Sequence, residues 1–269
     1  MKSASEELLA ATGPTHEPYR VLLREVRSRL RLTRRQMEAQ VEGLPVPEGQ
    51  AYLRREELMA PLQLLDRSLR AVGLSDIADG DLKNTLRRLN CFGITLLRLD
   101  IRQESTRHSD VLDAITRYLQ LGRYSDWDEA ARQAFLVDEL QARRPLIDAA
   151  FRDSEHCTAE VAEVLATCEV IAEQGSEGLG AYVISMATTP SDVMAVMLLQ
   201  KIAGAREPMR VVPLFETLDD LDGAEQTMSA LLALPFYRER VAAGQEIMIG
   251  YSDSAKDAGF LGAAWAQYR

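Results

Sequence analysis

Three short stretches place ionisable side chains where an apolar, strand-like segment gives way to a helical one. They contain Arg102 in "LDIRQES", Glu216 in "PLFETL", and Asp253 with Lys256 in "GYSDSAKD". Two carboxylates from neighbouring strand ends could hold a hard divalent cation such as Mg²⁺, which takes one or two protein oxygens plus water and substrate. Arginine offers a planar fork for phosphate or carboxylate, and lysine offers a mobile point charge. The set therefore predicts phosphate chemistry on a small acid, at a site that stabilises increasing negative charge.

Each of these residues also has a purely structural interpretation. Asp253 or the adjacent Ser252 could cap a helix, because short oxygen-bearing side chains are preferred there. Glu216 could pair with a lysine, and Arg102 could bridge acidic side chains at the rim of a sheet. The functional interpretation depends on all of them meeting in one place.

The elements that would bring them together are alternating strands and helices. Apolar runs rich in branched side chains predict strands at residues 92–101, 181–187, 209–216 and 245–251, the first of them buried on both faces. Helical patterns follow at 105–119, 188–204, 218–235 and 252–269, with Ser105 as the expected N-cap of the first. Two inserted helices are predicted at 129–144 and 159–173. Four strand–helix units in series indicate parallel strands, and in such folds ligands bind at the carboxyl ends of the strands.

The first part of the chain has a different pattern, helical throughout. Helices are predicted from 17 to about 43, from 53 to 72, and from about 81, with "GLPVPEGQ" separating the first two. We therefore expect a helical lead-in region at residues 1–88 and a β/α region at residues 89–269.

The remaining ionisable and sulfur-bearing residues give weaker signals. His108 could lie near the pocket, but a surface or capping role is favoured, and the methionines Met186, Met194 and Met197 are most simply explained as core. The three cysteines have neither paired spacing nor nearby histidines, so we expect buried, reduced thiols rather than a zinc site. These cysteines are Cys91, Cys157 and Cys168.

Composition and charge exclude several classes of protein. The chain has 41 acidic and 31 basic residues, giving a formal net charge of −10, which argues against a broad nucleic-acid or anionic-membrane surface. The arginines between residues 20 and 35 alternate with glutamates, as on a solvated or intrachain docking face. The N-terminus lacks a signal-peptide core, and the longest uncharged run, 178–191, is too short to cross a bilayer. A soluble, cytoplasmic protein is expected.

Four strings carry a family resemblance. "CFGITLLRLDIRQESTRHSDVL", "AYVISMATTPSDVMAV", "VVPLFETLDDLDGA" and "IMIGYSDSAKDAGFLGAAWAQY" occur in the order and approximate spacing of phosphoenolpyruvate carboxylases of the bacterial type. The chain resembles this family over nearly its entire length, and "LDIRQES" and "GYSDSAKDAG" are the most specific strings.

The resemblance implies a (β/α)₈ TIM barrel with added helices, in a cytoplasmic homotetramer that is regulated allosterically. It implies a carboxy-lyase that converts phosphoenolpyruvate and bicarbonate into oxaloacetate and phosphate with Mg²⁺ or Mn²⁺. By similarity, Glu216 and Asp253 are the metal ligands, Arg102 binds the substrate phosphate, and Lys256 is the active-site lysine. Bicarbonate attack would give carboxyphosphate and the pyruvate enolate, which then captures CO₂. Asp100 and Asp257 are expected to be structural or to support the site from behind, orienting cationic neighbours.

The resemblance also implies that the chain is a part of a longer protein. Only four strand–helix units are expected where a closed barrel needs eight, so the fold class is an α/β half barrel behind a helical region. The family's histidine-bearing segment, glycine-rich loop and effector region have no counterpart here. We expect the piece alone to be inactive and prone to self-association, through its unpaired strand edges and exposed apolar surface.

Two other functions remain open at this level. One is a metal-dependent phosphotransferase on a related phosphoenolpyruvate-binding barrel, although such an enzyme needs a phosphorylatable histidine that the sequence does not suggest. The other is a non-catalytic module that binds the ligand without turnover.

Overall fold

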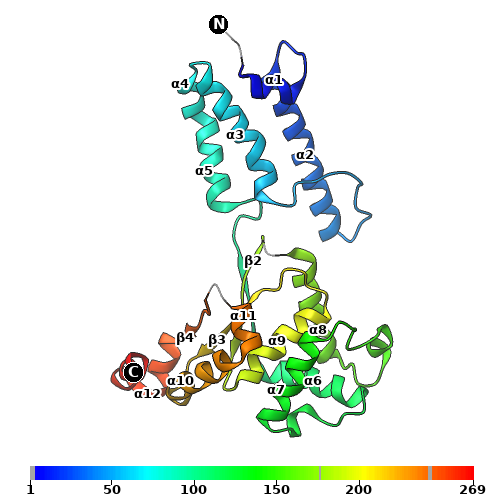
Figure 1. Ribbon diagram of the computed structural model, residues 1–269, viewed down its shortest axis with the longest axis vertical. Coiled ribbons are helices and arrows are strands. Elements are labelled where there is room, and N and C mark those ends of the chain that lie inside the picture. The colour runs from blue at the N-terminus through cyan, green and yellow to red at the C-terminus, as the bar shows by residue number, and fades with distance from the viewer. Residues whose placement is uncertain (1–3, 176, 242–243) are drawn as a thin grey trace. The chain divides into compact units, whose positions relative to one another are not determined.

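The computed structural model describes residues 4–175, 177–241 and 244–269. Its internal contacts divide the chain into two compact units, Met1–Leu97 and Arg98–Arg269 (Figure 1). We call them the helical unit and the β/α unit, and describe each by itself.

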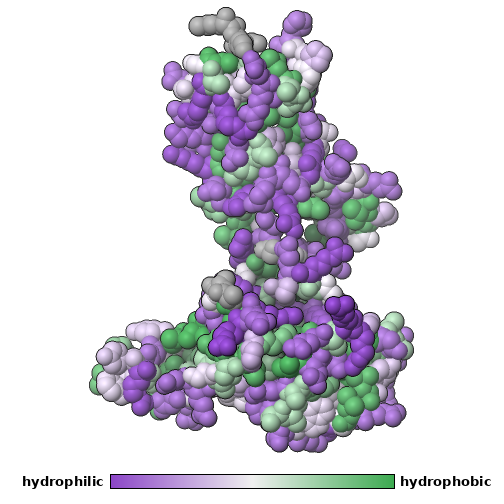
Figure 2. Space-filling view, in the orientation of Figure 1, coloured by the Kyte–Doolittle hydropathy of each residue, from purple (hydrophilic) through white to green (hydrophobic). Residues whose placement is uncertain are grey.

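The helical unit contains α1 (Glu6–Thr12), α2 (Pro18–Val41), α3 (Arg55–Ala71), α4 (Ser75–Ile77), the π-helical turn η1 (Ala78–Leu82) and α5 (Lys83–Phe92). Pro18 occupies the first turn of α2, where its missing N–H costs no hydrogen bond. One apolar cluster, which includes Leu8, Leu22, Leu62 and Leu89, joins α1, α2, α3 and α5. Hydrophilic residues cover most of the visible surface of this unit (Figure 2).

The β/α unit alternates strands with helices. Its elements are β1 (Leu99–Glu104), α6 (Ser105–Tyr118), η2 (Tyr124–Asp126), α7 (Glu129–Gln141), η3 (Ala149–Asp153), α8 (Ala159–Gln174), β2 (Leu179–Ser185), α9 (Pro190–Ile202), β3 (Arg210–Phe215), α10 (Leu218–Ala233), α11 (Pro235–Arg240), β4 (Met248–Ile249) and α12 (Tyr251–Tyr268).

The four strands form one parallel sheet in the order β1-β2-β3-β4. This arrangement confirms the expected fold class, a partial α/β barrel. Tyr182, Ile184 and Val211 pack with α6 to α10 in the main core, whereas Ala181, Val183, Val212 and Leu214 form a small cluster of their own. Because successive side chains in a strand point to opposite faces, the second cluster marks the face of the sheet away from the helices. We call it the inner face.

The first strand differs from its prediction in position and burial. It begins at Leu99 rather than at residue 92, because Gly93 ends α5 with a φ of 59° and Leu96 adopts a φ of 72°, so neither fits an extended strand. Arg102 consequently lies inside β1 and not after it. The expectation of a strand buried on both faces is wrong, since β1 pairs with β2 at the outside of the sheet and is half-buried or exposed along its length.

A bulge fixes the register of β1 against β2. Leu99 pairs with Leu179 but Ile101 pairs with Tyr182, so β2 carries one extra residue. The Asp100 carboxylate accepts a hydrogen bond from the Ala181 N–H at 2.9 Å, and a Cβ on Gly180 would lie 2.4 Å from the same carboxylate oxygen. Asp100 therefore has a structural role, as expected, but the partner that its carboxylate binds is a backbone amide of β2 and not a cationic side chain.

Lys201 of α9 caps the carboxyl end of α7. Its ammonium group donates to the backbone carbonyls of Glu139, Leu140 and Ala142, which the helix itself leaves without partners. Lys201→Met is therefore expected to lower the free energy of unfolding by about 1.5 kcal/mol. Both tryptophans of the chain, Trp127 and Trp265, belong to the β/α unit, so their fluorescence during urea unfolding reports this unit.

The control for this variant is Arg210→Met. Arg210 forms an ion pair with Glu246 in which both side chains are about half exposed, so its loss should change stability by less than about 0.5 kcal/mol. Equal effects of the two substitutions would contradict a capping role for Lys201.

Several side-chain predictions for burial need correction. Cys168 is buried, as expected, but Cys91 is exposed and Cys157 is partly exposed. Among the methionines, Met194 is fully buried, whereas Met186 is 53% exposed at the end of β2, where its φ of 55° turns the chain toward α9. Periodicity cannot find such a residue, because a turn departs from the pattern of the strand.

Apolar side chains are exposed near both outer strands of the sheet. Leu99 is exposed in β1, and Ile249 in β4. The second half of α12 adds Leu261 and Trp265, which are 80% and 61% exposed. Self-association of the isolated chain, which depends on such surfaces, stays a prediction.

Candidate metal and phosphate site

Glu216 directly follows β3, and the first turn of α10 fixes its backbone. Thr217 and Asp220 form a capping box, in which the Thr217 hydroxyl accepts from the Asp220 N–H at 3.1 Å. The Asp220 carboxylate in turn accepts from the N–H groups of Glu216 and Thr217, at 3.3 and 3.0 Å. Alternation along β3 places Glu216 on the same face as Leu214, the inner face. Among the described residues, the Glu216 carboxylate has no ion-pair partner, so the lysine pairing considered for it is not observed.

Asp253 lies inside a helix rather than in a loop. The helix α12 begins at Tyr251, so "YSDSAKDA" forms its first two turns, and Gly259, with a φ of 72°, then interrupts the helical geometry. The N-cap is Gly250, which has no side chain, so neither Ser252 nor Asp253 caps α12. Asp253 stands in the first turn, where the positive end of the helix dipole favours a carboxylate.

Gly250 allows the two acidic segments to approach each other. Its N–H donates to the Phe215 carbonyl at 2.8 Å, which continues the pairing of β3 with β4. A Cβ built on Gly250 would lie 2.4 Å from the Glu216 Cβ and 3.1 Å from the Glu216 Cα. Only glycine therefore fits between β4 and the residue that carries the Glu216 carboxylate.

The two cationic residues lie in different settings. Arg102 pairs in register with Val183, an inner-face residue, and is exposed; within the described ranges its guanidinium group has neither a hydrogen bond nor an ion pair. The bridging of rim acids considered for Arg102 is therefore not observed. Lys256 lies one turn after Asp253 and donates to its carboxylate at 3.1 Å, with both side chains largely exposed.

Electrostatics connect three of the four predicted site residues. Partial burial raises the pKa of Glu216, and the negative charges of Asp253 and then Asp220 raise it further, while the positive charge of Arg102 opposes the increase. Glu216 therefore experiences the fields of both Asp253 and Arg102. Two carboxylates that repel each other beside an arginine are a combination of charges that a divalent cation and an anion could neutralise together.

The donor set fits Mg²⁺ in number and kind. Two carboxylates suffice for this ion, because water and substrate oxygens supply the remaining ligands. A group of three or more acidic, histidine or cysteine side chains, as a site built entirely from protein ligands would need, does not occur among the residues described.

Sequence patterns missed the residues that hold this site together. Asp257 was expected to be structural or to orient a cationic neighbour; its carboxylate accepts the Leu218 N–H at 2.9 Å, a partner that the sequence did not indicate. Asp220 and Gly250 gave no recognisable signal apart from their closeness to Glu216 and Asp253. The "ETLDD" string does contain the Thr-x-x-Asp spacing of a capping box, which identifies Asp220 once the helix start is known.

His108 and Ser105 have other roles than those predicted. His108 is fully buried on the helix side of the sheet, where its Nε2 and the Tyr182 hydroxyl share a hydrogen bond of 2.9 Å. It is therefore neither a surface residue nor part of the inner face. Ser105 is the first residue of α6, not its cap, and its hydroxyl donates to the Met186 carbonyl at 2.7 Å, joining the ends of β1 and β2.

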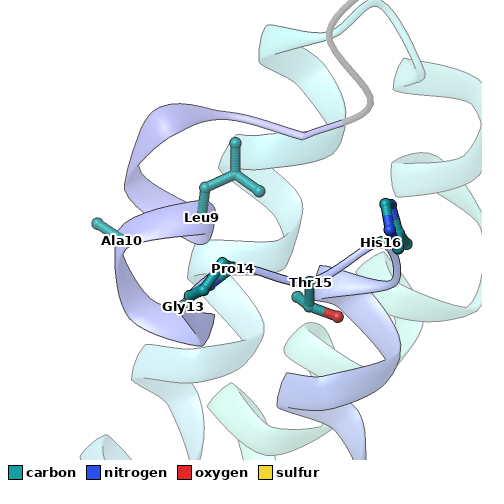
Figure 3. A pocket seen from close by; sticks show the side chains of 6 residues that line it. All are labelled: Leu9, Ala10, Gly13, Pro14, Thr15 and His16. Carbon is teal, nitrogen blue, oxygen red and sulfur yellow. The ribbon is translucent and has the colours of Figure 1, made fainter.

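A cavity of about 610 Å³ lies elsewhere, in the helical unit. Side chains of α1 and of the loop after it line the cavity (Figure 3). They are Leu9, Ala10, Gly13, Pro14, Thr15 and His16. One ionisable group, His16, is among them, so the cavity offers none of the carboxylates that the cation chemistry above requires.

Comparisons with known proteins agree with the strings noted above. A family model described as phosphoenolpyruvate carboxylase matches residues 1–269. The whole chain is 55% identical to a phosphoenolpyruvate carboxylase of Pseudomonas aeruginosa, 54% identical to one of Shewanella loihica and 50% identical to one of Acinetobacter baumannii. In each case it covers 30% of the relative, so the chain corresponds to part of a longer family member. None of the helices described here is long and apolar enough to span a membrane.

Proposed function

Because this chain belongs to the phosphoenolpyruvate carboxylase family, we propose that it supplies the metal- and phosphate-binding part of a site that carboxylates phosphoenolpyruvate. The reaction consumes bicarbonate and gives oxaloacetate and phosphate. One observation carries the proposal. Gly250, the N-cap of the helix that carries Asp253, lies so close to Glu216 that a Cβ on Gly250 would be 2.4 Å from the Glu216 Cβ. The opposite effects of Asp253 and Arg102 on the pKa of Glu216 agree with this proximity.

Each residue has a role that follows from its chemistry. Glu216 and Asp253 would hold Mg²⁺ or Mn²⁺, which when bound offsets the negative charge that increases during the reaction. Arg102, exposed and unpaired within the described part of the chain, binds the substrate phosphate through its planar fork. Lys256 places its amino group 3.1 Å from the Asp253 carboxylate, where it can hold bicarbonate or the carboxyphosphate derived from it. The family resemblance further supports a homotetramer as the active assembly.

Mn²⁺ binding tests the metal assignment. Glu216→Gln removes one anionic ligand while keeping the shape of the side chain, so we expect the dissociation constant for Mn²⁺ to rise at least about tenfold, or ~1.4 kcal/mol. Free Mn²⁺ can be measured by electron paramagnetic resonance while the full 269-residue chain is titrated.

Glu225→Gln is the matched control, because it removes the same charge from an exposed position on α10. It should leave the dissociation constant within about twofold of the unchanged protein. An unchanged affinity in Glu216→Gln would refute the metal assignment and leave Glu216 with a structural role.

A further inference from the structure

Glu216 and Asp253 belong to different strand–helix units, and both carry negative charge. Asp220 and Asp257 add two more carboxylates within a few residues of them. The charges of Asp253 and Asp220 both act against ionised Glu216, so fixed contacts between the ends of β3 and β4 oppose this repulsion. The backbone pairing of β3 with β4 covers two residue pairs, Leu214 with Met248 and Phe215 with Ile249.

Beyond that pairing, a hydrogen bond joins the second turn of α12 to the first turn of α10. Asp257 of α12 accepts the Leu218 N–H of α10 at 2.9 Å. Leu218 lies two residues after Glu216, and Asp257 lies one helical turn after Asp253. The bond therefore connects the two segments that carry the paired carboxylates.

The local chemistry of α10 leaves this N–H for a partner outside the helix. The first N–H groups of a helix have no acceptor within it. Asp220 already accepts from Glu216 and Thr217, and Thr217 accepts from Asp220, so the capping box does not reach Leu218. Asp257 provides the missing acceptor, and its negative charge at the positive end of the α10 dipole strengthens the bond.

We propose that Asp257 is a positioning residue, which holds α12 against the first turn of α10 and so keeps the Glu216 and Asp253 carboxylates at the separation that a shared divalent cation requires. This inference rests on the proposed function for its metal. Its geometric part, the bond from Asp257 to the Leu218 N–H, is independent of any metal.

Two substitutions at Asp257 separate hydrogen bonding from charge. Asp257→Ala removes the acceptor, whereas Asp257→Asn removes the charge and keeps a carbonyl oxygen that can accept the same bond. For Asp257→Ala we expect the Mn²⁺ dissociation constant of the full chain to rise about tenfold, and Asp257→Asn should restore it to within about threefold of the unchanged protein. Asp219→Ala removes an exposed charge from the same turn of α10 and should have no effect.

Hydrogen exchange provides the readout that does not depend on metal. The Leu218 amide, followed by NMR without Mn²⁺, should exchange faster in Asp257→Ala and at the original rate in Asp257→Asn and Asp219→Ala. Unchanged Leu218 exchange in Asp257→Ala, or equal losses of Mn²⁺ affinity in the Ala and Asn variants, would overturn the positioning role.

The same titrations distinguish this failure from failure of the proposed function. If Glu216→Gln weakens Mn²⁺ binding and Asp257→Ala does not, the positioning role alone is wrong. If Glu216→Gln has no effect, the metal site is wrong and the positioning role is overturned with it.

Discussion

Lowering the pH from 7.5 to 5 is expected to cost the β/α unit about 2 kcal/mol of stability through His108 alone, increasing to about 3 kcal/mol near pH 4. Burial, with a smaller effect of the positive charge of Arg107, lowers the pKa of this side chain from 6.5 to about 4. Between these two values the unfolded chain binds a proton that the folded protein does not. Stability is therefore complete above pH 6.5 and falls as the pH decreases toward 4.

The comparison that isolates this effect uses His108→Gln. Glutamine does not titrate and can still form a hydrogen bond with the Tyr182 hydroxyl. Urea unfolding followed by tryptophan fluorescence at pH 7.5 and pH 5 gives a stability difference for each protein. The difference should be about 2 kcal/mol larger with histidine at position 108, because other acid-sensitive groups contribute equally to both proteins. If the change in unfolding free energy between pH 7.5 and pH 5 were equal in the two proteins, folding would not lower the pKa of His108.

Gly250→Ala is expected to destabilise the β/α unit by about 2–3 kcal/mol, because the new methyl group would overlap the Glu216 Cβ. The φ of Gly250 is −77°, which alanine adopts freely, so steric overlap and not backbone strain is the cause. The structure can relieve the overlap only by moving β4 away from Glu216. Such a movement separates Glu216 from Asp253, so Mn²⁺ affinity should fall together with stability.

Gly223→Ala is the control for this substitution. Gly223 lies inside α10 with open space where its Cβ would be, so alanine should stabilise the helix by up to about 1 kcal/mol. The free energy of unfolding should therefore fall in Gly250→Ala and rise in Gly223→Ala. Mn²⁺ affinity should fall in Gly250→Ala only. A Gly250→Ala protein as stable as the unchanged one would show that the β3–β4 junction tolerates a side chain.

The sequence by itself determined the four strands, most of the longer helices and their order, although not every boundary. Apolar runs of strand length alternate with helical patterns from β1 to α12, and crossovers of this kind require parallel strands, as the sheet has them. It also picked out Arg102, Glu216, Asp253 and Lys256, because each is a charged side chain within or just after an apolar run of strand length. The family followed from four strings in the order and spacing of the family.

Only the tertiary structure decided how the site is held together and which polar residues are buried. Gly250 is required because the Glu216 backbone approaches it, and Asp257 and Asp100 bind amides of segments 39 and 81 residues away in sequence. His108 is buried although its helix position suggested a surface role, because α6 presents it to Tyr182 of β2. Periodicity reports the conformation of neighbouring residues along the chain, whereas these contacts depend on the packing of segments that are distant in sequence.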